Sequence, residues 1–207
     1  MKIYRYTMGE CATNCYLLVA DNGDAALIDA PALCDSLLDE LEKVQLKKIL
    51  LTHGHYDHFA VAKQLQERFD GAEICIHEAD DIMMRTPECN VSREVCGRPY
   101  VISADRLFHD GDEVTVGELT VSVMHTPGHS RGSVCYCVED IIFTGDTLMR
   151  ENIGRLDLYG GDEQTMFASI AMIRDLEGDR TLLPGHGPDT TLAHERMANY
   201  FMRRRYR

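Results

Sequence analysis

The sequence lacks the features of several large classes of protein. Its 21 basic residues are outnumbered by 34 acidic ones, giving a net charge of −13, so it lacks the basic surface that an electrostatic nucleic-acid binder needs. No apolar run is long enough to span a bilayer. Residues 1–6 alternate like a strand instead of forming the apolar core of a signal peptide. We therefore expect an acidic, cytoplasmic protein that binds neither nucleic acid nor a membrane, and we expect the basic tail at 203–207 to be the solvated end of a last helix.

The length and the cysteines point to a single reduced domain. The 207 residues suit one domain, spanning positions 1–207, with a sizeable core and no internal repeats. Eight cysteines are present, and in the cytoplasm they should stay reduced. Cys135 and Cys137 flank Tyr136, so in a strand their side chains share one face. We interpret them as buried core thiols rather than as a metal site.

One short stretch carries most of the chemical information. His53-Gly54-His55-Tyr56-Asp57-His58 places three imidazoles and one carboxylate within six positions. It directly follows the apolar run at 49–51, which predicts a buried strand. A strand that ends in a polar loop delivers its last side chains to the edge of a sheet. Imidazole nitrogens and carboxylate oxygens are the donors that zinc and similar divalent metals bind.

Three more candidate ligands follow in similar settings. His129 lies in Thr-Pro-Gly-His-Ser, Asp146 in Thr-Gly-Asp-Thr and His186 in Leu-Pro-Gly-His-Gly. Each comes just after an apolar, strand-like run, with glycine or proline to let the backbone turn. Together with the first stretch they make seven candidate ligands, none of them cysteine. That set is too large for one closed structural tetrad.

In this order, the seven residues resemble the signature of the metallo-β-lactamase superfamily of hydrolases. Within it, the segments at 152–162 and 184–196 resemble the short, single-domain hydrolases of the glyoxalase II type (hydroxyacylglutathione hydrolase-like). The resemblance implies an α/β fold, a four-layer αβ/βα sandwich. Full-length glyoxalase II also has a C-terminal helical domain that helps to hold glutathione, whereas only about twenty residues follow His186 here.

The resemblance also assigns roles to the residues. It implies two divalent metal ions, zinc first and iron or manganese as alternatives. His53, His55 and His129 would hold one ion, Asp57, His58 and His186 would hold the other, and Asp146 would bridge them. A hydroxide bound between the metals would attack a carbonyl, with Asp57 orienting the attacking water as well as binding metal. The resemblance also makes Arg155 the closest match to a basic residue that contacts glutathione, so Arg155 is the candidate substrate-binding residue.

The leaving group favours one class of substrate. A thiolate leaves readily because its conjugate thiol has a pKa of about 8.5, whereas an amide nitrogen needs a proton donor that the motifs do not supply. We therefore expect hydrolysis of thioesters of the S-acylglutathione type. Three alternatives stay open: a persulfide dioxygenase-like enzyme with a single iron, a β-lactamase, and a metal-binding module without turnover.

The apolar periodicity predicts where the helices and strands lie. We expect strands at 1–7, 15–20, 25–29, 48–52, 74–76, 113–117, 119–125, 133–138, 140–144 and 181–183, and helices near 33–44, 59–69 and 162–176. Residues 80–110 contain a possible helical turn but otherwise show no period. A long irregular segment of this kind is either a functional lid or a connecting loop.

Overall fold

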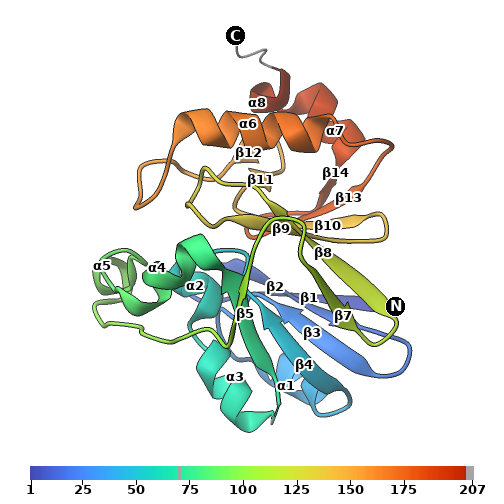
Figure 1. Cartoon of the computed structure of the whole chain (residues 1–207). Coiled ribbons are helices and arrows are strands. Elements are labelled where there is room, and N and C mark those ends of the chain that lie inside the picture. Colours follow the sequence, from blue (N-terminus) through green and yellow to red (C-terminus); the bar gives the residue numbers. More distant parts are fainter. Residues whose placement is uncertain (70, 204–207) are drawn as a thin grey trace.

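The first half of the chain builds a six-stranded sheet. The computed structural model describes residues 1–69 and 71–203, and its first sheet has the spatial order β1-β2-β3-β4-β5-β6. The first three strands pair antiparallel and the others parallel. The strands are β1 (Lys2–Met8), β2 (Thr13–Val19), β3 (Asp24–Ile28), β4 (Gln45–Leu50), β5 (Glu73–His77) and β6 (Arg106–Phe108). Helices α1 (Asp35–Leu41) and α3 (Ala62–Arg68) cover its outer face (Figure 1).

The second half repeats this plan. Its sheet has the order β14-β13-β10-β9-β8-β7. The strands are β7 (Glu113–Val116), β8 (Leu119–His125), β9 (Val134–Val138), β10 (Ile141–Gly145), β13 (Thr181–Pro184) and β14 (Thr190–Thr191), with a small hairpin, β11 (Leu148–Met149) and β12 (Asn152–Ile153), beside them. The outer face is covered by α6 (Glu163–Arg174), α7 (Leu192–Ala198) and α8 (Tyr200–Arg203) (Figure 1).

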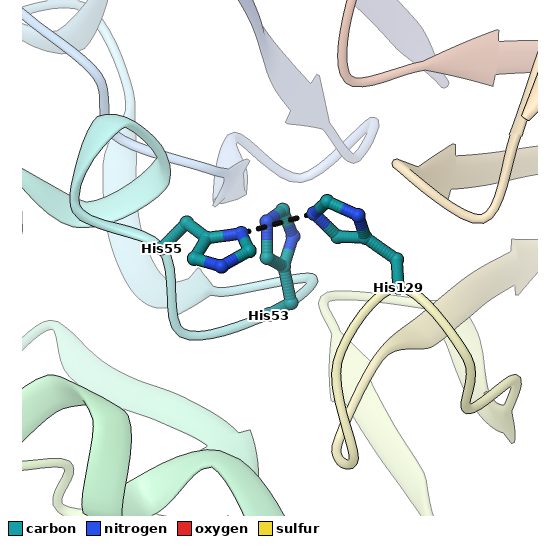
Figure 2. A group of neighbouring side chains, drawn as sticks. All are labelled: His53, His55 and His129. Carbon is teal, nitrogen blue, oxygen red and sulfur yellow. Dashed lines mark hydrogen bonds between the residues drawn. The ribbon is translucent and has the colours of Figure 1, made fainter. Parts of the chain in front are cut away.

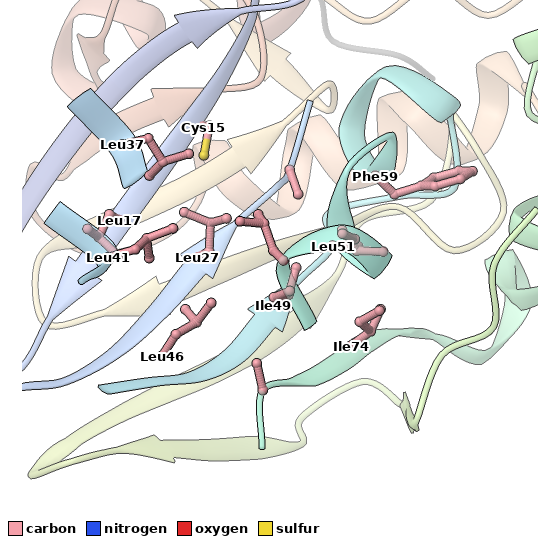
Figure 3. Packing of buried hydrophobic residues seen from close by; sticks show 14 of the residues in the cluster. Cys15, Leu17, Leu27, Leu37, Leu41, Leu46, Ile49, Leu51, Phe59 and Ile74 are labelled. Carbon is pink, nitrogen blue, oxygen red and sulfur yellow. The ribbon is translucent and has the colours of Figure 1, made fainter. Parts of the chain in front are cut away.

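Three apolar layers hold the four structural layers together. Along β2, Cys15 and Leu17 face the cluster under α1 and α3, whereas Tyr16 and Leu18 face the second sheet. Figure 3 shows Cys15 and Leu17 beside residues of α1 and β3. A third cluster joins the second sheet to α6, which contributes Met166. Because both faces of the central strands are buried, they are apolar throughout instead of alternating. This is the four-layer αβ/βα sandwich expected from the sequence.

Most of the predicted strands lie within a few residues of the observed ones. The helix predicted at 59–69 is wrong at its start, because helical structure begins earlier in the chain. A turn of helix, α2 (Tyr56–Phe59), begins inside the motif, so Asp57 and His58 lie on a helix and not in a loop. The helix then breaks before α3 begins. At the break, Val61 donates its amide to the carbonyl of Ala30 at 3.1 Å, and Ala30 donates to that of His58 at 2.6 Å. The loop after β3 therefore takes the hydrogen bonds that would continue the helix.

The irregular segment at 80–110 is more ordered than its sequence suggests. The short helix η1 (Glu78–Asp80) leads into it, and it contains α4 (Asp81–Arg85), α5 (Ser92–Cys96) and β6. The buried side chain of Asn90 donates to the carbonyls of Met83 at 2.8 Å and Tyr100 at 3.0 Å, which ties the segment together from inside. Its role as a lid stays a prediction.

Two further sequence expectations concern membrane-spanning segments and the basic tail. Among residues 1–69 and 71–203, no helix combines the length and apolar character needed to cross a bilayer. The basic tail falls outside the described residues except for Arg203, which ends α8. The structure therefore leaves the role of the tail as a prediction.

Candidate metal centre

The seven candidate ligands come together where strands of the two sheets end. β4 runs directly into the motif that carries His53, while β10 and β13 pair in parallel and end just before Asp146 and His186. Since parallel strands end at the same edge, the last two residues are neighbours. An isolated bridge between Thr13 and His186 joins this edge to the first sheet. Ligands from both halves of the sequence thus meet between the sheets.

The ligand atoms form three overlapping groups. Within each group the candidate donor atoms lie within 4.8 Å of one another. The groups are His53, His55 and His129; His53, His58 and Asp146; and Asp57, His58 and His186. The first and third groups consist of the same residues as the two ion sites expected from the sequence. The second group shares His53 with the first and His58 with the third, and it adds Asp146. Asp146 approaches His129 Nε2 and His186 Nε2 at 3.5 Å each, so its carboxylate lies between the first and third groups, and its bridging role stays a prediction.

Hydrogen bonds fix which imidazole nitrogen faces the centre. Nδ1 of His58 lies 2.8 Å from Asp29 Oδ2, Nδ1 of His129 lies 2.8 Å from the carbonyl of Arg155, and Nδ1 of His186 lies 3.2 Å from that of Cys11. Carboxylate and carbonyl oxygens only accept, so each Nδ1 carries a proton, and Nε2 is the nitrogen left to bind a metal. Such outer partners orient metal-binding histidines.

His55 differs from the other histidines in the nitrogen it directs inward. Its Nδ1 lies 2.9 Å from His129 Nε2 (Figure 2). His53 has Nδ1 3.1 Å from the hydroxyl of Thr52, which itself donates to Asp29, so His53 directs Nε2 inward. The donors of the first group are therefore one Nδ1 and two Nε2 atoms.

The donor set fits divalent cations. Within the described residues, the candidate donor atoms His53 Nε2 and Asp146 Oδ1 are buried without a hydrogen-bond partner, which is costly unless something else satisfies them. Burial and the surrounding imidazoles hold the pKa of His53 well below its usual range, so it is a neutral ligand. Although burial opposes it, Asp29, Asp57 and Asp146 raise the pKa of His58 to about 10. In the metal-free protein His58 thus supplies positive charge that a bound ion would replace.

Asp29 organises two of the ligands and was missed by the sequence analysis. It is buried at the end of β3 with a left-handed φ of 59°, which is uncommon for a residue other than glycine. Its carboxylate accepts from the Thr52 amide and hydroxyl, at 2.8 Å each, and from His58. The signal was present, because Asp29 follows an apolar strand as the ligands do.

Asp80 joins the two loops that carry the first group of ligands. It has no exposed surface. Its Oδ2 accepts from the Gly54 amide at 2.9 Å and the Ser130 hydroxyl at 2.6 Å, and its Oδ1 accepts from the Gly132 amide at 2.6 Å. Burial raises the pKa of Asp80 although these donors lower it. Nothing in the sequence singled out Asp80, because its partners lie 26–52 positions away.

The second group is fixed from the N-terminal side and by close backbone packing. Thr13 donates to Asp57 Oδ2 at 2.7 Å, and Asp57 Oδ2 lies 3.5 Å from His186 Nε2. Although burial opposes it, His58, His186 and Thr13 lower the pKa of Asp57, so it is ionised at neutral pH. Gly185 permits the approach of the loop, since a Cβ there would lie 2.3 Å from Asp146 Oδ1.

A cavity of about 930 Å³ opens beside the centre and includes Arg155. Asp146 and His186 form part of its wall, and Met149, Ile153, Leu156 and Phe201 contribute apolar surface. Arg155 makes a paired ion bridge to Asp157, with Nε–Oδ1 and Nη2–Oδ2 distances of 2.7 Å each. This bridge gives Arg155 a structural role in its own loop. Its role in substrate binding stays a prediction.

The remaining histidines do not join the centre. The rings of His77 and His125 stack with centroids 4.0 Å apart, and burial together with His125 lowers the pKa of His77 to about 4. His194 lies 2.9 Å from Glu151 on the surface. All eight cysteines are free, and Cys135 is buried in the cluster under α6. The interpretation as a buried core thiol is confirmed for Cys135, whereas Cys137 is only half-buried and packs against the same cluster.

Comparison of the sequence with known proteins gives matches over nearly the whole chain. The family model described as the metallo-beta-lactamase superfamily matches residues 8–186. The Mycobacterium leprae protein ML0493 is 37% identical over 98% of this chain and 99% of its own. The probable metallo-hydrolase YqgX of Bacillus subtilis is 32% identical over 98% of both chains. Hydroxyacylglutathione hydrolase GloC of Haemophilus influenzae is 32% identical over 91% of this chain and 92% of its own.

Solved structures agree with the sequence matches. BLEG-1, a B3 metallo-beta-lactamase, superposes with a TM-score of 0.90 at 35% identity, covering 97% of this chain and 99% of its own. TTHA1623 in a di-iron-bound form gives 0.83 at 30% identity, covering 96% and 99%. ETHE1 from Myxococcus xanthus gives 0.80 at 28% identity, covering 97% and 84%. These likenesses support the observed fold, and the di-iron form shows that zinc is not the metal in every similar protein.

Proposed function

Because this chain belongs to the metallo-beta-lactamase superfamily, we propose that it is a metal-dependent hydrolase that cleaves thioesters of the S-acylglutathione type. The observation that carries the hydrolase is the convergence of seven nitrogen and oxygen donors from both halves of the chain. The similarity to a hydroxyacylglutathione hydrolase over more than nine-tenths of each chain supports the choice of substrate.

Two divalent ions fit the donors, with zinc as our first choice and iron as the alternative that a di-iron relative supports. His53, His55 and His129 would hold one ion, Asp57, His58 and His186 the other, with Asp146 between them. Such ions lower the pKa of a bound water to about 7 and polarise a carbonyl. Because ions held by both halves of the chain would tie the sheets together, we treat residues 1–207 as one domain.

The protein's own residues contribute orientation and charge. Ionised Asp57 is fixed by Thr13 and can accept a hydrogen bond from the attacking water, which turns an oxygen lone pair toward the carbonyl carbon. The thiolate leaves without a protein acid because its conjugate thiol is itself acidic, with a pKa of about 8.5. We assign the thiol arm of the substrate to the cavity of about 930 Å³ beside Asp146, with Arg155 at its wall. The free thiols of all eight cysteines support action in the cytoplasm.

β-Lactam hydrolysis is the second candidate, because BLEG-1 is similar over 97% of this chain. A lactam releases an amine instead of a thiolate, and among residues 1–69 and 71–203 we assign no acid that would protonate it. We therefore rank this reaction below thioester hydrolysis.

A substrate panel with metal analysis tests the proposal. The purified protein is assayed for metal content and then for turnover of S-lactoylglutathione, a neutral small thioester, a β-lactam and a persulfide with an oxygen electrode. We expect thioester turnover that is lost on chelation and restored by zinc. Oxygen consumption with a persulfide, or turnover of the β-lactam alone, would assign another activity.

A further inference from the structure

A second cavity meets the same group of ligands. It has a volume of about 340 Å³ and includes Asp57 in its wall, whereas the cavity of about 930 Å³ includes Asp146 and His186. Asp57 and Asp146 each approach His186 Nε2 at 3.5 Å. One cavity is built by the first half of the chain and the other by the second half. The two cavities therefore flank a common centre, as the two arms of a cleaved substrate would.

The walls of the second cavity are mainly apolar. Tyr56 and Tyr100 pack with ring centroids 5.7 Å apart and tilted planes. Leu33 is a large apolar side chain that is 41% exposed. Val61, directly before α3, also lines the cavity. Exposed apolar surface gathered in a concave site beside polar chemistry is typical of a ligand subsite.

Arg98 completes the wall over the aromatic pair. Its guanidinium lies 5.1 Å from the ring centroid of Tyr100 and donates to the hydroxyl of that residue at 2.5 Å. Within the described part of the chain Arg98 forms no ion pair with an acidic residue, so its contact with the ring of Tyr100 is what positions it. Its aliphatic stem then adds to the apolar surface of the cavity.

We propose that this second cavity, the acyl cavity, binds the acyl arm of the substrate, and that the protein is selective for acyl groups of several apolar carbons. The cavity has room for roughly ten groups the size of a water molecule, more than a two-carbon acyl group fills. An aliphatic or aromatic acyl group displaces water from the walls around Tyr100 and Leu33 while its carbonyl stays beside Asp57. This proposal rests on the proposed thioester hydrolysis.

Carboxylate binding tests the acyl cavity without turnover. Straight-chain carboxylates of two to eight carbons, the products of such a reaction, are titrated calorimetrically into the zinc-loaded protein. A fully buried methylene tightens binding about fourfold, so affinity should rise with chain length and then level off. A wild-type affinity that does not depend on chain length would overturn the proposal.

Two tryptophan variants on one helix locate the effect. Gln64 is exposed and lines the acyl cavity, whereas its exposed neighbour Lys63 does not. Gln64→Trp should fill the cavity and remove the dependence on chain length, and Lys63→Trp should keep it. If Gln64→Trp does not fold, Leu33→Ser, which removes an exposed apolar wall, should weaken octanoate binding about tenfold. A dependence on carboxylate length that survives in Gln64→Trp, or an unchanged octanoate affinity in Leu33→Ser, would place the acyl group elsewhere.

Acyl-thioester kinetics separate this proposal from the one on which it rests. Turnover of thioesters together with carboxylate binding that ignores chain length would reject the acyl cavity alone. Binding that depends on chain length without any thioester turnover would reject the proposed reaction and keep the cavity.

Discussion

Removing the Asp80 carboxylate should loosen the centre without touching a candidate ligand. Asp80→Ala leaves the buried amides of Gly54 and Gly132 without their acceptor, while Ser130 keeps a bond to Ser133 at 2.7 Å. Two unsatisfied buried amides cost about 1–3 kcal/mol each. Part of this cost is offset, because burying the carboxylate charge already destabilises the folded wild-type protein. The same burial raises the pKa of Asp80. We expect a net loss of about 2–3 kcal/mol in the free energy of unfolding.

Urea unfolding of the metal-free protein measures this loss, and metal titration measures its consequence. The loops that hold His53, His55 and His129 are no longer tied together, so metal affinity should fall about 10- to 100-fold. Asp80→Asn keeps one acceptor oxygen, so it should lose less stability and less metal affinity than Asp80→Ala. Asp81→Ala is the matched control, because it breaks only a surface ion pair with Arg85. Wild-type stability together with wild-type metal affinity in Asp80→Ala would refute the reasoning.

Three other substitutions probe separate parts of the account. Asp146→Ala removes the carboxylate that lies between the two ion sites, so bound metal should fall from two ions to one and turnover should collapse; elemental analysis that still finds two ions, with wild-type turnover, would reject the bridging role. Arg155→Ala should raise KM for S-acylglutathiones with little change in kcat, while a neutral small thioester is hardly affected. Equal effects on both substrates would reject the role of Arg155 in substrate binding and leave it only the structural ion bridge to Asp157. Cys135→Ser puts a hydroxyl in a buried apolar cluster, so it should lower thermal stability without changing metal content; a metal loss at unchanged folding would revive a thiolate ligand.

The strand pattern and the ligands could be predicted because both leave local signals. The apolar run before His53 predicts a strand, and the polar residues after it predict a sheet edge. Glycine and proline marked the turns before His129 and His186 in the same way. The family resemblance then supplied the pairing of the two halves, which periodicity alone does not give.

The residues that the sequence analysis missed act through contacts distant in sequence. Asp29 and Asp80 bind groups 23–52 positions away, and neither stands in a motif. The helix at 59–69 was misplaced because Ala30, from another loop, takes its hydrogen bonds. The acyl cavity likewise depends on Tyr100 packing against Tyr56, which only the folded chain brings about.

Metal titration of the apo-protein tests the central claim most directly. Zinc is added stepwise to chelator-treated protein, and bound metal, S-lactoylglutathione turnover and thermal stability are followed together. The account predicts that turnover appears as the centre fills, reaches its maximum at two ions per chain, and rises in parallel with stability, because ligands from both halves are tied through the ions. Full turnover in protein shown by elemental analysis to be free of metal would contradict it.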